Sequence, residues 1–125
     1  MTDSAPRLPD YLRHIVEAIE RIQRYTEDID ELAFAQNQMV QDAVIRNFEI
    51  IGEASRNIER VSPGFAAAHP QLPLSFAYEM RNVLAHGYFK VDIGVVWNTI
   101  ERDLPTLHAQ GMSVIADFDQ TLNDR

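Results

Sequence analysis

Apolar residues recur at three-, four- and seven-residue steps along most of this chain, which is the spacing of one face of an α-helix. The first such series runs from Leu12 to Ile29 and includes Ile15, Ile19 and Ile22. No stretch alternates apolar and polar residues over the length of a strand, and no Asn-Gly pair marks a hairpin. The pattern therefore predicts an all-α bundle of four to five helices.

Proline, glycine and capping residues mark where the predicted helices begin and end. The first helix is expected to begin at Asp10, because this residue follows Pro9 and can cap a helix with its side chain. The second is expected to begin at Asn37 or Gln38 and to end at Ser62-Pro63-Gly64, a combination that terminates helices. The first half of the chain is therefore predicted to form two long helices.

The second half of the chain is predicted to hold several more helical segments. Pro73 suits the first turn of a helix that ends before Gly87. Asp92 can cap a further helix, which Pro105 should kink or restart after Arg102. The other segments with helical spacing are residues 65–69, 74–86 and 111–125.

Chain length and composition indicate one globular domain. The 125 residues suffice for one hydrophobic core and are too few for two, and 46% of them are hydrophobic. Residues 1–9 are predicted to be a flexible N-terminal arm, and residues 10–125 a single helical domain. The chain shows neither the apolar core of a signal peptide nor a run of the roughly 20 apolar residues that span a bilayer. We therefore expect a cytoplasmic protein.

Charge and residue types exclude several kinds of site. The chain has no cysteine, which rules out disulfides, thiol nucleophiles and zinc–thiolate centres. Its formal net charge of −8 leaves no global field that would attract nucleic acid, so RNA would have to be held by a local cluster. No glycine-rich phosphate loop and no HExxH motif occur. His14, His69 and His108 lack metal-ligand spacing and are interpreted as surface or capping residues. The sequence therefore predicts neither a metal nor a cofactor.

One short segment, from Arg81 to Phe89, concentrates polar side chains at the end of a predicted apolar helix. Arg81 offers a fork of donors that fits a phosphate, and His86 can transfer a proton near neutral pH. Asn82 could orient the histidine ring, and Tyr88 could hold a phosphate or a base or accept a modification. A structural interpretation also stands, since arginine and histidine near a helix C-terminus interact favourably with its dipole.

The angular spacing of these residues bears on how a site could form. At ~100° per residue, Arg81 and Tyr88 lie within about 20° of one another, whereas Arg81 and His86 are about 140° apart. Asn82 and His86 are four residues apart and share a face. Either the backbone turns at His86-Gly87, or a second subunit completes the site. The spacing thus favours a cleft at a dimer interface.

Glu53 lies in the predicted second helix, next to Gly52 and close to the apolar stripe. A glycine inside a helix costs about 1 kcal/mol relative to alanine and often marks the close approach of another helix. Glu53 is then either a solvated edge or a buried polar partner for an arginine. We regard it as a candidate supporting residue for the site.

The segment Arg81-Asn82-Val83-Leu84-Ala85-His86-Gly87-Tyr88 resembles the R-x4-H-x-Y motif of the HepT-like toxins, within the HEPN superfamily. The similarity covers roughly residues 10 to 110. One departure is Leu74 after Pro73, where the family often has tryptophan, and this concerns packing more than chemistry. The flanking segments that share the resemblance are Asp10-Tyr11-Leu12-Arg13-His14-Ile15, Glu49-Ile50-Ile51-Gly52-Glu53-Ala54, Tyr88-Phe89-Lys90-Val91-Asp92, Val96-Trp97 and Asp103-Leu104-Pro105.

This resemblance implies a homodimeric, or larger, HEPN-like helical bundle with the motifs of two subunits lining an interface cleft. It implies a metal-independent endoribonuclease that acts as the toxin of a type II- or type VII-like toxin–antitoxin pair. Arg81 and His86 would then be the catalytic pair, with Asn82 in support, and the RNA 2′-hydroxyl would be the nucleophile. Tyr88 matches the tyrosine to which the antitoxin, a minimal nucleotidyltransferase, adds AMP.

Two other functions remain open from the sequence. Some HEPN relatives are non-catalytic partners or nucleotide-binding modules of a nucleotidyltransferase. A purely structural helical bundle is the third alternative. In that case, substitutions at Arg81 and His86 would alter stability but no activity.

Overall fold

The computed structural model describes residues 8–70 and 92–123 of the chain, and every regular element in these two ranges is a helix. The predicted all-α fold is therefore confirmed. The elements in chain order are α1 (Leu8–Thr26), α2 (Glu31–Ala35), α3 (Gln38–Val61), α4 (Phe65–Ala68), α6 (Ile93–Asn98), the π-helical segment η2 (Thr99–Asp103) and α7 (Leu104–Asn123).

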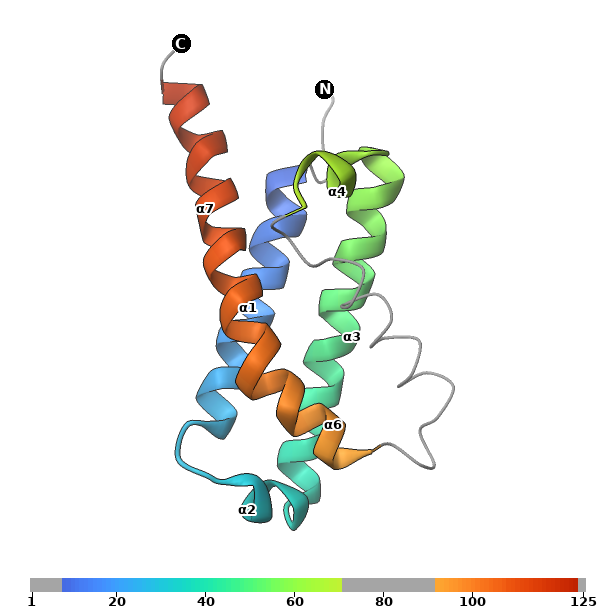
Figure 1. The fold of residues 1–125 in the computed structure, drawn as a ribbon, viewed down its shortest axis with the longest axis vertical. Coiled ribbons are helices and arrows are strands. Elements are labelled where there is room, and N and C mark those ends of the chain that lie inside the picture. The colour runs from blue at the N-terminus through green and yellow to red at the C-terminus, as the bar shows by residue number, and fades with distance from the viewer. Residues whose placement is uncertain (1–7, 71–91, 124–125) are drawn as a thin grey trace.

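Helix α1 lies between the other two long helices, since it packs against α3 on one side and α7 on the other. Figure 1 shows α1 running in the opposite direction to both of them, with the short helices α2 and α6 at one end of the bundle and α4 at the other. None of the described helices is long and apolar enough to cross a membrane.

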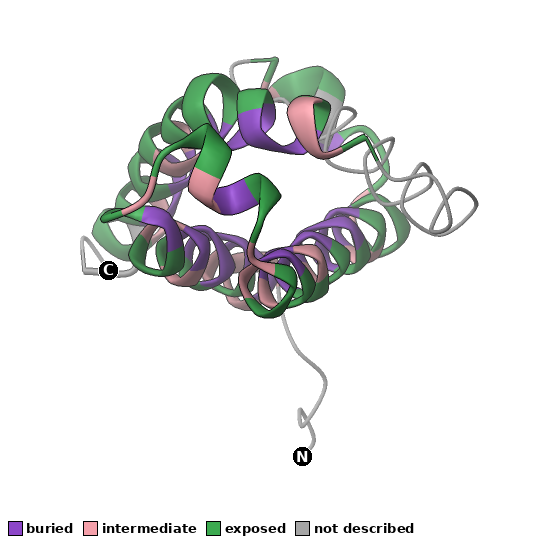
Figure 2. Cartoon of the chain, turned by 90° about the horizontal axis from the view of Figure 1, so that it is seen from below, coloured by how far each residue is buried: buried purple, intermediate pink, exposed green. Residues whose placement is uncertain are grey.

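The core is built from the apolar faces that the spacing predicted. Seen along the bundle in Figure 2, the buried positions face inward and the exposed ones outward. The largest fully buried side chains are Phe34, Phe48, Leu12, Ile15, Ile19, Ile22, Ile51, Ile58, Leu104, Leu107, Val44 and Val96. Burying one such side chain stabilises the fold by about 1.5–3 kcal/mol, so the packing of these faces holds the long helices together.

The start of α1 corrects one expected boundary. The helix begins at Leu8, so Asp10 lies inside its first turn rather than capping it. Pro9 is compatible with this start, because the first N–H groups of a helix have no partner within the helix. A carboxylate in the first turn also interacts favourably with the helix dipole. The last two residues of the predicted arm thus belong to α1, and residues 1–7 lie outside the described ranges.

The boundaries of α3 are confirmed at both ends. The side chain of Asn37 caps the helix by accepting a hydrogen bond of 3.1 Å from the N–H of Val40. At the other end, the N–H of Ser62 donates to the carbonyl of Ile58 at 2.9 Å. Gly64 then has a φ of 87°, in the left-handed region that glycine enters without steric cost.

Pro105 changes the hydrogen bonding of the last long helix without breaking it. Asp92 caps α6 as expected, accepting from the N–H of Val95 at 3.2 Å. The helix then widens into the π segment η2, where the N–H of Leu104 donates to the carbonyl of Thr99. Because Pro105 has no N–H to donate, the wider turn accommodates the break in the α-helical ladder, and α7 continues from Leu104.

Gly111 does not separate the C-terminal segment from the helix before it. The described part of the short helix expected over residues 111–125, residues 111–123, belongs to the continuous α7. Gly111 is buried where α7 crosses α1. A Cβ atom added to it would lie 3.1 Å from Cγ2 of Val16. The glycine is therefore explained by the close approach of two helices rather than by a helix end.

We expect Gly111→Leu to lower the free energy of unfolding by about 1–3 kcal/mol, the usual cost of overpacking a filled site. Urea denaturation of the wild type and the variant measures this difference. Ser113→Leu is the matched control, because it adds the same side chain to an exposed position of the same helix. Equal stability of Gly111→Leu and the wild type would contradict the close approach of α1 and α7.

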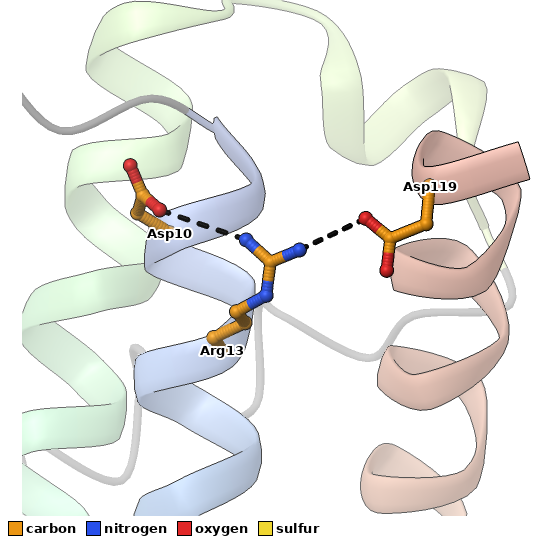
Figure 3. Close-up of polar contacts among 3 residues, drawn as sticks. All are labelled: Asp10, Arg13 and Asp119. Carbon is orange, nitrogen blue, oxygen red and sulfur yellow. Dashed lines mark hydrogen bonds and ion pairs between the residues drawn. The ribbon is translucent and has the colours of Figure 1, made fainter. Parts of the chain in front are cut away.

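Polar contacts also join α1 to α7. Figure 3 shows the guanidinium of Arg13 between two carboxylates, 3.6 Å from Asp10 and 3.0 Å from Asp119. Nearer the other end of α1, Nε2 of His108 lies 2.9 Å from a carboxylate oxygen of Glu20. Such exposed pairs contribute about 0–1 kcal/mol each, so they orient the two helices more than they stabilise them.

Candidate functional site

The four motif residues singled out by the sequence, Arg81, Asn82, His86 and Tyr88, lie outside the described residues. The predicted motif helix over residues 74–86 and the glycine after it lie there too. The structure therefore leaves the grouping of these side chains as a prediction, and it describes only one candidate site residue, Glu53.

Glu53 lies on α3 with its side chain exposed. The side chain therefore lies at a solvated edge of the helix and is not buried. Its neighbour Gly52 is buried, as expected for a glycine at a close contact. The carboxylate of Glu53 nevertheless has a specific position, because it lines an open depression of about 210 Å³ between α1 and α3.

The depression is lined by residues from the first half of α1 and from the middle and second half of α3. These parts lie side by side because the two helices run in opposite directions (Figure 1). The lining residues are Tyr11, His14, Arg46, Glu49, Ile50, Glu53, Ala54 and Asn57. All but Arg46 and Asn57 belong to two of the segments that carry the family resemblance, so those segments meet in space.

Helical spacing explains how these side chains reach one surface. Tyr11 and His14 are three residues apart on α1, and their rings meet edge to face with centroids 6.2 Å apart. On α3, the lining residues follow steps of three and four from Arg46 to Asn57. The floor is apolar, since Tyr11 and Ala54 are buried, while four exposed polar side chains form the rim: His14, Arg46, Glu49 and Glu53.

A hydrogen bond fixes α1 against α3 next to the depression. Nε of Arg21 donates to Oδ1 of Asn47 at 2.7 Å, and Nδ2 of Asn47 donates to the carbonyl of Ala43 at 2.9 Å. Asn47 is 4% exposed, so its amide is buried with both ends satisfied. This contact joins α1 to α3, the two helices that line the depression.

Sequence reasoning missed most of this surface. His14 was interpreted as an ordinary surface histidine, and it is exposed, but its position in the depression was not foreseen. Arg46 and Asn57 were not singled out at all. The signal that could have found the surface was the pair of family-like segments containing Tyr11 and Glu53, which a two-helix hairpin brings together. Within the described ranges, no three histidine, aspartate or glutamate side chains are grouped so as to hold a metal ion.

Comparison with known proteins identifies the family. A family model described as "Ribonuclease HepT-like" matches residues 15–114. A protein named probable ribonuclease HepT, from Thermococcus cleftensis, is 45% identical over 98 residues, which is 78% of this chain and 86% of that protein.

Two relatives come from Methanocaldococcus jannaschii. One, whose name joins a gamma-glutamylcyclotransferase with an RNase, is 37% identical over 115 residues. That match covers 92% of this chain but 50% of the relative, so the chain spans about half the length of that protein. The other, named as an RNase, is 37% identical over 97 residues, covering 78% of this chain and 86% of the relative. No solved structure is significantly similar to the chain.

The matched range contains the Arg81–Tyr88 motif, most of both helices around the depression and the helix that follows Asp92. The resemblance read from the sequence is thereby confirmed. The chain belongs to the HepT-like ribonuclease family of the HEPN superfamily.

Proposed function

We propose that the protein is a metal-independent endoribonuclease that acts as the toxin of a toxin–antitoxin pair in the cytoplasm. The observation that carries the proposal is the match of the ribonuclease family model across residues 15–114, which includes the R-x4-H-x-Y motif. Relatives with ribonuclease names that align over most of their own length support it.

The motif residues suit a cleavage reaction in which the 2′-hydroxyl of the RNA substrate is the nucleophile. In the proposed reaction, the 2′-oxygen attacks the adjacent phosphorus and the 5′-oxygen of the next nucleotide leaves. A 2′,3′-cyclic phosphate and a free 5′-hydroxyl result. His86 moves the proton in this exchange, and Arg81 neutralises the charge that develops on the phosphate oxygens. Asn82 orients the histidine ring.

The angular spacing of the motif supports a dimer as the active form. Arg81 and His86 point about 140° apart on a straight helix, at ~100° per residue, so one helix does not bring them to a common point. We propose that the motifs of two subunits face each other across a cleft, in a homodimer or a larger homo-oligomer. Glu53, exposed on α3, is a candidate for supporting this cleft.

Tyr88 provides the proposed means of inactivation. A minimal nucleotidyltransferase antitoxin would join the phenolic oxygen of Tyr88 to the α-phosphorus of ATP, with release of pyrophosphate and of the phenolic proton. The attached AMP would place a negative charge and a base where the substrate phosphate binds. The modification would thus block the site by repulsion and by bulk.

We expect the purified protein to cut single-stranded RNA in the presence of excess chelator and to leave 2′,3′-cyclic phosphate ends. Gel analysis of end-labelled RNA, with and without phosphatase and acid treatment of the products, measures both features. A strict requirement for a divalent metal, or products with other ends, would contradict the proposed mechanism. Intact RNA combined with tight binding of the nucleotidyltransferase would favour the alternative function, a non-catalytic partner.

A further inference from the structure

The outward face of α7 differs from the outward faces of α1 and α3. The exposed positions of α1 and α3 are mostly charged, whereas residues 104–116 of α7 contain no aspartate, glutamate, lysine or arginine. The inward face of this stretch is buried and consists of Leu104, Leu107, Gly111, Val114 and Ile115. A helix that has no charged face is usually covered on both sides. The outward face of α7 is therefore a surface on which another helix could pack.

Four exposed residues form a continuous stripe along this face. Their positions follow steps of four, three and four residues, which is the spacing of the seam between two helices of a coiled coil. They are Pro105, Ala109, Met112 and Ala116. Met112 is 47% exposed, although methionine is mostly buried in folded proteins. The small alanine side chains beside it would let a second helix approach closely.

The charges at the two ends of the stripe suit an identical partner. Arg102, exposed before the stripe, and Asp119, exposed after it, are equally far along the chain from the midpoint of the stripe. A two-fold axis through that midpoint pairs two antiparallel copies of α7 so that Arg102 lies opposite the partner's Asp119. The same axis places Ala109 opposite the partner's Met112. Opposite charges thus meet at both ends, and uncharged side chains meet between them.

Both charged residues can take part in this pairing. In the part of the chain that the structure describes, Arg102 makes no hydrogen bond or ion pair. Asp119 binds Arg13 through Oδ1 at 3.0 Å (Figure 3), and the second oxygen of a carboxylate can accept from another guanidinium. The net charge of −8 disfavours contact between two copies over acidic surfaces, so the uncharged stripe is where a second copy meets little repulsion.

We propose that a second copy of the chain packs on this face, with the two α7 helices antiparallel about a two-fold axis. The contact joins the uncharged residues of the two stripes and forms one ion pair at each end. These exposed ion pairs fix the direction of the pairing more than they strengthen it. The inference goes beyond the proposed ribonuclease function, because it depends on none of the motif residues.

The first test replaces Met112 with glutamate, which would put a carboxylate opposite the partner's Ala109. We expect association through this face to weaken, with a dissociation constant raised by about 30-fold or more, the usual effect of losing a central interface residue. Sedimentation over a range of protein concentrations measures this change, and circular dichroism checks that the variant stays helical. Met39→Glu is the matched control, since Met39 is 78% exposed but lies on α3, and it should associate like the wild type.

The second test examines the direction of the pairing by cross-linking. The chain has no cysteine, so introduced cysteines can form disulfides only with each other. Under mild oxidation, an equal mixture of Ala109→Cys and Met112→Cys should form linked dimers faster than either variant alone, because the two positions lie opposite each other in the antiparallel pair. Glu59→Cys, at an exposed position of α3, is the control and should stay unlinked.

The outcomes separate this proposal from the proposed function. Unchanged association of Met112→Glu, or a wild type that is monomeric at every concentration, would overturn the α7 interface. Faster linking of Ala109→Cys to itself would indicate parallel helices and would also overturn it. RNA cleavage is measured on the same samples. A wild type that cuts no RNA but dissociates on Met112→Glu would contradict the ribonuclease function and support the interface, and RNA cleavage with an unaffected assembly would do the reverse.

Discussion

Replacing His86 with alanine is expected to lower the rate of RNA cleavage by about 10²–10⁴-fold, the usual contribution of a general acid or base. Histidine is the side chain whose ordinary pKa lies near neutrality, so it can both take and return a proton at physiological pH. In the proposed reaction, the proton of the attacking 2′-hydroxyl and the proton gained by the leaving oxygen both need such a group. The measurement is the single-turnover cleavage rate of an end-labelled RNA, with excess protein.

His108→Ala is the matched control for this variant. His108 lies on α7, where Nε2 is 2.9 Å from Glu20, and it does not line the depression between α1 and α3. The same chemical change there should leave the cleavage rate within about twofold of the wild type, since a surface pair contributes little. Equal loss in both variants would point to a stability effect, and full activity of His86→Ala would exclude the proposed catalytic role.

The cleavage assay also tests whether the active form is an oligomer. If two subunits complete the site, a protein that is monomeric in solution at the assay concentration should cut RNA poorly. Sedimentation of the wild type across the concentration range of the assay tests this, because the cleavage rate per chain should rise as the dimer forms.

Much of the fold was predictable because local chemistry and packing agree along the chain. Ile15, Ile19 and Ile22 occur at helical spacing and all three are buried. Asp92 caps the helix it was expected to cap, and α3 begins at Gln38, within the predicted range. When local preferences agree with the global fold in this way, secondary structure can be predicted from the sequence.

The errors arose where one residue type has two structural uses. Asp10 can cap a helix or occupy its first turn, and only the position of Leu8 in the helix decides between them. Gly111 can end a helix or admit a neighbouring one, and the closeness of Val16 on α1 decides that case. Both decisions depend on contacts that local sequence does not contain.

The candidate site also has one part that the sequence predicts and one part that it does not. The motif from Arg81 to Tyr88 is contiguous, so a linear pattern was enough to single it out. The depression is lined by residues of two helices, from Tyr11 to Asn57, and its existence depends on how α1 packs against α3. A surface built from distant segments is visible only once the helices are placed.

Replacing Tyr88 with phenylalanine is expected to abolish the addition of AMP by the partner nucleotidyltransferase while leaving RNA cleavage close to that of the wild type. The phenol oxygen is the proposed acceptor, and phenylalanine removes that atom while keeping the ring. Intact-mass measurement after incubation with the partner and ATP should show AMP increments in the wild type and none in Tyr88→Phe. The variant should therefore stay active where the modified wild type loses activity.

Tyr25→Phe provides the control, because Tyr25 is 38% exposed on α1 and is open to the same enzyme. It should gain AMP as the wild type does, which would show that the partner selects its target by position and not by exposure alone. Increments that persist in Tyr88→Phe and disappear in Tyr25→Phe would place the acceptor on α1. The inactivation of the ribonuclease would then need another explanation. A phosphate added on α1 would not compete with the substrate phosphate for the position beside Arg81.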